Sequence, residues 1–137
     1  MGPIVDDRLH EVSQGDWEGL VCSQMYTTEV SASAQELGND FRAPGGESIN
    51  DVRKRAFIFM GTVTWEQPGE DSTVLAFGHG FITRAIAGVI LGWTHQQTRE
   101  YPTHNTSVTL FEHDGQAWNV GFIGNNILCP KAPKLLI

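Results

Sequence analysis

The sequence predicts an α/β domain with a mixed sheet, and three segments carry this prediction. Val74-Leu75-Ala76-Phe77 is a short, continuously apolar run of the kind expected for a strand buried on both faces. A helix-like run over residues 81–91 follows it and ends at a glycine. Residues 107–112 and 116–123 are rich in strand-forming side chains and flank Asp114-Gly115, a strong hairpin signal. This order of strand, helix and hairpin is typical of α/β domains.

The segments before these three are expected to form loops and helices. Ile4-Val5 is interpreted as the end of a short strand, and residues 8–20 as an ordered loop around two glycines. Residues 21–38 have broken helical character, and Pro44-Gly45-Gly46 predicts a turn.

The clearest predicted helix begins after Ser48. Ser48 is a favourable N-cap, and Asp51 three residues later approximates a capping box. Pro68-Gly69 is expected to end this helix. Within this helix, apolar side chains recur at steps of three and four residues, which predicts a stripe facing a core: Ile49, Val52, Ala56, Phe59, Met60 and Val63.

Length and composition indicate a single globular domain over residues 1–137. The chain is long enough for one core and too short for two. No stretch approaches the roughly 20 apolar residues that a membrane span needs, and the first residues lack the pattern of a secretory signal. We therefore expect a cytoplasmic protein that does not bind membranes.

The charge distribution argues against nucleic acid as a partner. The net charge is −7 and no run of Lys and Arg is present, whereas a nucleic-acid binder needs a basic surface. A small phosphorylated ligand remains compatible with this charge, provided that its cleft supplies local positive potential. Cys22 and Cys129 are far apart, and the histidines have no zinc-site spacing, so we expect no disulfide and no metal.

Gly78-His79-Gly80, between the predicted strand and helix, is the most informative motif for chemistry. Ligands of α/β sheets gather at the carboxyl ends of strands, and a helix N-terminus there favours phosphate. The glycines permit close backbone approach, and a histidine can donate to a phosphate oxygen. We predict that His79, Gly80 and Arg84 bind phosphate. Alternatively, His79 caps a turn and Arg84 pairs with an acidic neighbour.

Glu11 is a candidate general acid in the loop of residues 8–20. A lone carboxylate in a loop is more often solvated or a cap, and its chemistry as an acid requires a leaving group within reach. Asp16 and Glu18 lie nearby and are equal candidates on the residues alone.

Four stretches of the sequence, in this order, match the motifs of one known family. Residues 9–19, which read LHEVSQGDWEG, are similar to an LxExxxGxWEG segment. Residues 44–48 resemble a PGGES turn, residues 74–80 a VLVVSHG strand, and residues 105–110 an NxSVTxL strand. Together they resemble the histidine phosphatase superfamily, the phosphoglycerate-mutase-like family with an Arg-His-Gly motif, over nearly the whole chain from about residue 4.

The resemblance implies a fold and a mechanism. The fold would be a mixed, mostly parallel sheet flanked by helices in three layers. The activity would be hydrolysis or transfer of a phosphomonoester through a phosphohistidine, with no metal or organic cofactor. By this resemblance, His79 matches the second, phosphate-binding histidine, Glu11 matches the proton donor, and Glu47 is a structural turn residue.

The sequence departs from the family pattern in one respect. It contains no Arg-His-Gly and no match to the segment that carries the second phosphate-binding arginine. We therefore expect an N-terminally incomplete domain, inactive alone and without the central strand that pairs beside residues 74–77. An unpaired, apolar sheet edge promotes association, so we expect a homo-oligomer.

Two other interpretations stay open at this point. The chain could be a non-catalytic module that binds or responds to a phosphorylated ligand, or a fragment without function. Residues 20–43, where the family's specificity resides, carry Arg42 as their one basic residue. This favours a small phosphomonoester over a bisphosphoglycerate.

Overall fold

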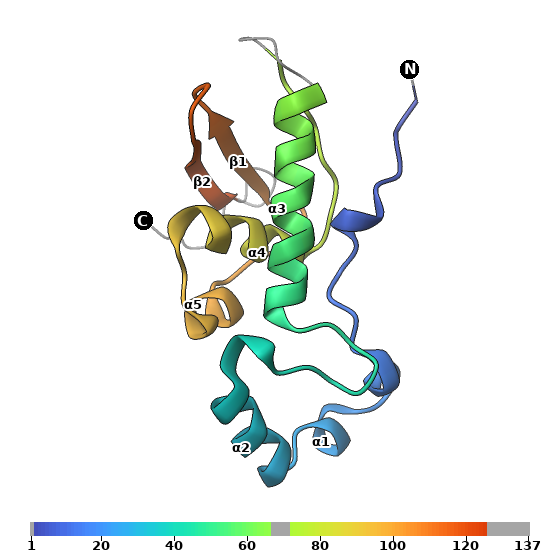
Figure 1. Ribbon diagram of the computed structural model, residues 1–137. Helices are drawn as coiled ribbons and strands as arrows, with labels where there is room; N and C mark the ends of the chain where they lie inside the picture. The colour runs from blue at the N-terminus through green and yellow to red at the C-terminus, as the bar shows by residue number, and fades with distance from the viewer. Residues whose placement is uncertain (1, 67–71, 126–137) are drawn as a thin grey trace.

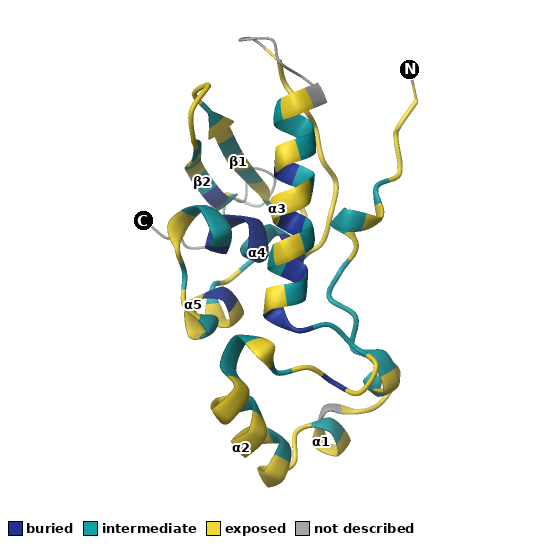
Figure 2. Ribbon diagram, viewed as in Figure 1, coloured by how far each residue is buried: buried dark blue, intermediate teal, exposed yellow. Residues whose placement is uncertain are grey.

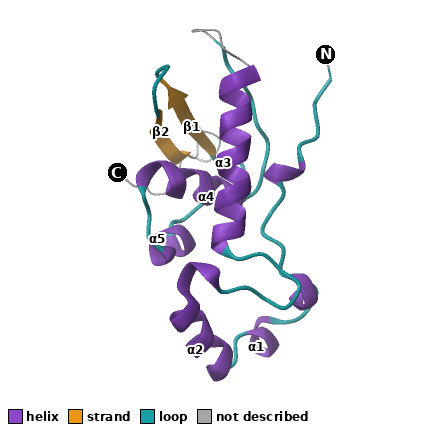
Figure 3. Cartoon of the chain, in the orientation of Figure 1, coloured by secondary structure: helices purple, strands orange, loops and turns teal. Residues whose placement is uncertain are grey.

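The computed structural model describes residues 2–66 and 72–125. Figures 1 and 3 show a long central helix, α3, with a β-hairpin on one side and shorter helices below. None of the described helices is long and apolar enough to cross a membrane. The elements are α1 (Cys22–Met25), α2 (Thr28–Leu37), α3 (Ile49–Glu66), α4 (Gly80–Leu91), α5 (His95–Glu100), β1 (Val108–His113) and β2 (Trp118–Asn125), with 3-10 turns at Asp7–Leu9, Gly15–Trp17 and Gly38–Asp40.

The predicted capping box of α3 is confirmed. The Ser48 N–H and hydroxyl both donate to Asp51 Oδ2 at 2.8 Å, and the Asp51 N–H donates to Ser48 Oγ at 3.1 Å. These reciprocal bonds satisfy N–H groups that have no partner within the helix. The predicted end at Pro68-Gly69 lies outside the described residues.

The core lies between α3 and α4. Val52, Ala56 and Met60, four residues apart on α3, form a buried stripe as predicted. They pack against Ile82, Ala85 and Ile86 of α4, and the facing sides of the two helices are buried in Figure 2. Small alanines at the contact let the helices approach closely, while Phe111 and Trp118 of the hairpin cover the cluster.

A polar clamp joins α3, α4 and α5. Arg53 Nη2 donates to the Trp93 carbonyl oxygen and, at 2.6 Å, to Thr98 Oγ1, which is buried. The clamp passes over Gly88, where a Cβ would lie 3.0 Å from both Arg53 Nη2 and Thr98 Oγ1. Sequence inspection missed α5, although Thr94 and Gln97 form a capping box that signals it.

The hairpin is confirmed as an antiparallel pair of β1 and β2. Asp114 Oδ1 accepts the N–H groups of Gln116 and Ala117 at 2.9 and 2.8 Å, and Gly115 adopts a φ of +91°. The side-chain bonds close the turn, and the glycine provides a backbone conformation that other residues rarely adopt.

The buried strand predicted for residues 74–77 is wrong for the described structure. This segment is not hydrogen-bonded as a strand, and Val74, Leu75 and Phe77 are 47, 77 and 83% exposed. It runs as an extended chain into α4 (Figure 1). The expected mostly parallel sheet is likewise not found there: the described residues contain the two-stranded β1–β2 sheet alone. The physical reason is that no described strand lies beside residues 74–77 to accept their backbone hydrogen bonds.

We predict that Ile82→Ala lowers the free energy of unfolding by about 2–5 kcal/mol, because it leaves a cavity in the α3–α4 core. Ile82 is 1% exposed, whereas Ile58 on α3 is 49% exposed. The control Ile58→Ala should therefore change stability by less than about 1 kcal/mol. Urea unfolding followed by circular dichroism measures both, and equal losses would contradict this assignment of the core.

Candidate functional site

The Glu11 side chain bonds to the N-terminus of α4, the helix whose N-cap residue is His79. Glu11 Oε2 accepts the N–H of Phe81, 70 residues further along the chain, at 3.2 Å, and Glu11 Oε1 accepts the N–H of Val12 at 2.9 Å. Phe81 belongs to the first turn of α4, and His79 is its N-cap residue. The carboxylate therefore lies at the positive end of the helix dipole, where negative charge is stabilised.

The imidazole of His79 is exposed and is not used to cap α4. Only its backbone carbonyl takes part in the described contacts, accepting the N–H and Oγ1–H of Thr83 at 3.2 and 2.9 Å. The alternative in which the His79 side chain caps a turn thus finds no support. Gly80 lets the Thr103 side chain approach the backbone closely, because a Cβ at position 80 would lie 2.7 Å from Thr103 Oγ1.

Arg84 lies one helical turn after this N-terminus. Its Nη1 donates to the carbonyl oxygens of Arg99 and Tyr101 at 2.6 and 3.3 Å, and its guanidinium stacks 5.1 Å from the centre of the Phe81 ring. Burial lowers the pKa of Arg84, while the charge of Glu11 acts in the opposite direction. Within the described chain, no carboxylate forms an ion pair with Arg84.

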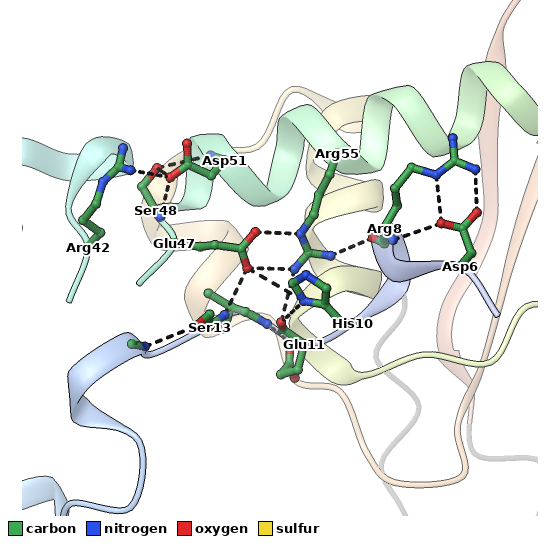
Figure 4. A network of polar contacts seen from close by, with 12 residues as sticks. Asp6, Arg8, His10, Glu11, Ser13, Arg42, Glu47, Ser48, Asp51 and Arg55 are labelled. Atoms are coloured by element: carbon green, nitrogen blue, oxygen red, sulfur yellow. Dashed lines mark hydrogen bonds and ion pairs between the residues drawn. The ribbon is translucent and has the colours of Figure 1, made fainter. Parts of the chain in front are cut away.

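Arg55 of α3 fixes the loop that carries Glu11 (Figure 4). Its Nε and Nη2 donate to the two oxygens of Glu47 at 2.8 and 3.1 Å. Its Nη1 donates to the Arg8 carbonyl oxygen at 2.6 Å, and Nη2 also donates to the Glu11 carbonyl oxygen at 3.2 Å. Arg55 is only 13% exposed at its side chain, so these bonds form in a partly desolvated environment that strengthens them.

Glu47 links the same loop to the Pro44-Gly45-Gly46 turn. Glu47 and Ser13 exchange two hydrogen bonds: the Glu47 N–H donates to the Ser13 carbonyl oxygen at 2.9 Å, and the Ser13 N–H donates to Glu47 Oε2 at 3.0 Å. Glycine is needed at position 15, where the loop passes close to the turn, since a Cβ on Gly15 would lie 2.2 Å from the Pro44 carbonyl oxygen. Two segments that both resemble family motifs are thus bonded directly to each other.

The other two candidate acids lie elsewhere in the loop. Glu18 Oε1 accepts from Ser13 Oγ at 3.0 Å and from the Gln14 N–H at 3.2 Å, so it closes its own loop. Asp16 is exposed. In the described part of the chain, only Glu11 of these three carboxylates bonds to α4.

Sequence reasoning missed Arg55, which occurs in the basic run of residues 53–55 and there resembles any solvent-facing charge. Only the packing of α3 reveals that it points toward the Glu11 loop. The described residues hold no group of three or more His, Cys, Asp or Glu side chains that could bind a metal ion.

With the geometry of the α4 N-terminus described, comparison with known proteins identifies the family of this chain. Residues 1–126 match the histidine phosphatase superfamily, branch 1. The chain belongs to this superfamily.

Among its relatives is the glucosyl-3-phosphoglycerate phosphatase of Mycolicibacterium vanbaalenii, 29% identical over 94 residues that cover 64% of this chain and 42% of the relative. A mycobacterial glucosyl-3-phosphoglycerate phosphatase, solved with inorganic phosphate, aligns with a TM-score of 0.69 and 23% identity over 87% of this chain. A structure described as mycobacterial hydrolase 2 aligns with a TM-score of 0.67 and 22% identity over 88%. The chain covers 63% and 58% of these two structures, which show the shared fold.

We predict that Glu47→Gln removes an acid-sensitive contribution to stability. Burial raises the pKa of Glu47, but hydrogen bonds from Arg55 and the Ser13 N–H outweigh it and hold the pKa below its ordinary value of 4.5. The ionised carboxylate therefore contributes stability above pH 4.5 that is lost as the pH falls through the lowered pKa. At neutral pH the variant should be less stable by about 1–3 kcal/mol.

Thermal unfolding of both proteins between about pH 7 and about pH 3 measures this effect. The difference in stability should shrink as the pH falls. Glu36→Gln, on an exposed part of α2, is the matched control and should show no such change. A difference that stays constant across the range would sink the assigned role of Glu47.

Proposed function

We propose that this chain is a phosphomonoester-binding domain of the histidine phosphatase type. His79 and the Gly80 backbone hold the phosphate at the N-terminus of α4, and Arg84 contributes positive charge. Glu11 is the proton donor to the leaving oxygen. The observation that supports the proposal is the hydrogen bond from the Phe81 N–H to Glu11 at the N-terminus of α4, the helix whose N-cap residue is His79.

The Glu11 carboxylate lies at the positive end of the α4 dipole, where a phosphate would also bind. A proton donor must lie within hydrogen-bond reach of the leaving oxygen. Because both groups would use the same helix N-terminus, we propose Glu11, and not Asp16 or Glu18, as the donor.

Turnover through a phosphohistidine also requires a nucleophilic imidazole that a strand and a glycine present to the phosphorus atom. The 137 residues contain no Arg-His-Gly. We therefore propose that these residues bind a phosphomonoester without hydrolysing it. This is also the function of the alternative interpretation, a non-catalytic module for a phosphorylated ligand.

We predict that inorganic phosphate binds near α4 and that His79→Ala weakens this binding at least about tenfold, the loss of one charge-assisted hydrogen bond. Chemical shifts of the Gly80 and Phe81 amides on titration with phosphate measure the affinity. His113→Ala, at the end of β1, is the control and should bind like the unmodified chain. Unchanged binding in His79→Ala would refute the proposed site.

The same preparation should not hydrolyse an aryl phosphate at a measurable rate. Robust hydrolysis that is abolished by His79→Ala would overturn the proposal that these residues bind without turnover, while leaving His79 in the site.

We also propose that residues 72–77 pair with a second copy of the chain. Leu75 and Phe77 are 77 and 83% exposed on an extended segment whose backbone is not paired in a sheet. Unpaired extended backbone beside exposed apolar side chains is a template for another strand. Such pairing would give residues 72–77 the backbone partner that the described part of one chain does not provide.

We expect sedimentation velocity to detect species larger than the 15.1 kDa monomer at micromolar concentration. The double substitution Leu75→Lys with Phe77→Lys should restore the monomer by introducing repulsion at the edge. Since both side chains are exposed, the circular dichroism spectrum should stay unchanged. A stable monomer of the unmodified chain would count against the proposal.

A further inference from the structure

The outer side of α3 carries an apolar stripe where a helix of a soluble protein usually carries charged side chains. Residues 56–65, which read AFIFMGTVTW, contain no charged residue at all. Phe57 and Trp65 are 67 and 85% exposed, and Ile58 is exposed as well. With 3.6 residues per turn, these side chains and Gly61 lie within about 100° of arc around the helix.

This set of residues, the α3 stripe, includes exposed turns of the upper half of α3 in Figure 2. The outer face of a helix is normally polar, and a contiguous apolar patch on a surface marks a place where another molecule binds. The α3 stripe therefore has the composition of an interface.

Gly61 lies in the middle of the α3 stripe, and its own chain gives no reason for a glycine there. Glycine in a helix interior destabilises the helix relative to alanine. At Gly88 of α4 a Cβ would be crowded by Arg53 and Thr98, whereas a Cβ at Gly61 would meet no atom within 4 Å among the described residues. The room at Gly61 is thus available to a second backbone that approaches from outside.

An apolar groove of about 240 Å³ opens beside Gly61, between α3, α4 and β2. Its lining contains no charged side chain: Phe57, Met60, Gly61, Val89, Ile90 and Trp118. An aromatic ring could enter it without desolvating an ionic group. Trp65, four residues beyond Gly61, is such a ring and is exposed to solvent. One helix thus carries both an exposed ring and a groove that suits it, which makes the surface self-complementary.

We propose that the α3 stripe packs against the α3 stripe of a second copy of this chain. The two helices are antiparallel, and the two Gly61 backbones meet where they cross. Phe57 and Trp65 are each four residues from Gly61, about 6 Å along the helix axis. A two-fold axis at Gly61 therefore brings Trp65 of each copy beside Phe57 of the other, as an isologous contact requires.

The packing of helix ridges explains how the groove is filled. Residues four apart form a ridge, and such ridges commonly fit into each other's grooves when the helices cross at about 50°. Phe57, Gly61 and Trp65 form one of these ridges. The groove next to this ridge, on the side of Met60, is the apolar groove at Gly61. Trp65 of each copy would occupy the groove of the other.

The available area predicts a weak dimer. Phe57, Ile58 and Trp65 together expose roughly 400 Å² of side-chain surface, whereas a standard interface buries about 800 Å² on each partner. The groove lining adds to the contact, which then belongs with small, transient interfaces. We expect a dissociation constant on the order of 100 µM. This contact does not depend on the proposed function, because the α3 stripe shares no residue with the His79 site or with residues 72–77.

The test uses the 137-residue chain with Leu75→Lys and Phe77→Lys, so that the edge at residues 72–77 does not contribute. Sedimentation equilibrium between about 10 µM and about 1 mM brackets the expected dissociation constant. We expect monomer at the low end of this range and dimer at the high end. Monomer at every concentration would overturn the proposal and point to a different protein as the occupant of the stripe.

Gly61→Glu in this background tests the contact itself, because the monomer has room for the added side chain. In the dimer it would bury charge and volume where the helices cross, so the dissociation constant should rise at least about tenfold. The melting temperature should not fall, since glutamate favours a helix more than glycine does.

Leu37→Glu is the matched control, because it adds the same charge at the exposed end of α2. It should leave the dissociation constant unchanged. Equal effects of Gly61→Glu and Leu37→Glu would show general charge repulsion and would overturn the contact at Gly61.

Mixing two variants tests the antiparallel arrangement. Phe57→Lys and Trp65→Glu should each weaken self-association, since each alters both aromatic contacts of the symmetric dimer. An equimolar mixture should associate more tightly than either variant alone. The mixed dimer keeps one contact between Phe57 and Trp65 and replaces the other by an ion pair. Parallel helices would bring equivalent positions together and form no such pair, so the absence of any gain on mixing would overturn the antiparallel dimer.

Discussion

The guanidinium of Arg55 donates hydrogen bonds to two backbone carbonyl oxygens of the Glu11 loop and to the Glu47 carboxylate at the same time. A loop of this length, with two short 3-10 turns as its only helical structure, loses much conformational entropy when it is ordered. The planar arrangement of donors on Arg55 compensates by binding several acceptors from one rigid group. Arg55 belongs to the same helix as the core residues Val52 and Ala56. Its hydrogen bonds therefore hold the loop in a fixed position relative to the core.

The N-terminus of α4 depends in turn on the position of this loop. Once Arg55 holds the Glu11 carbonyl, the Glu11 side chain meets the Phe81 N–H and satisfies one of the unpaired donors of the helix. The carboxylate therefore has a structural role in the unliganded chain and the proposed acid role when a phosphate binds. Both roles use the same helix dipole, and an arriving anion would compete with Glu11 for it.

Features governed by local sequence were predictable, and features governed by distant partners were not. The Ser48–Asp51 cap, the α3 stripe and the Asp114-Gly115 turn follow from residues within a few positions of each other, and the structure has all three. Residues 74–77 have the composition of a strand, but a strand exists only when another one accepts its hydrogen bonds. For the candidate site, the motifs pointed to Glu11 and His79, whereas Arg55 became visible only through the packing of α3.

The unpaired segment and the candidate site are one continuous piece of chain, since residues 72–77 lead directly into Gly78 and His79. In the described structure, the start of α4 is restrained from the Glu11 side and by the close approach of Thr103 to Gly80. The segment before it has no paired neighbour. A strand that paired with residues 72–77 would restrict the backbone at His79 and reduce the entropy that phosphate binding must otherwise overcome. The proposed pairing at the edge and the proposed anion binding at His79 should therefore favour each other, and by thermodynamic linkage the same coupling free energy would apply in both directions.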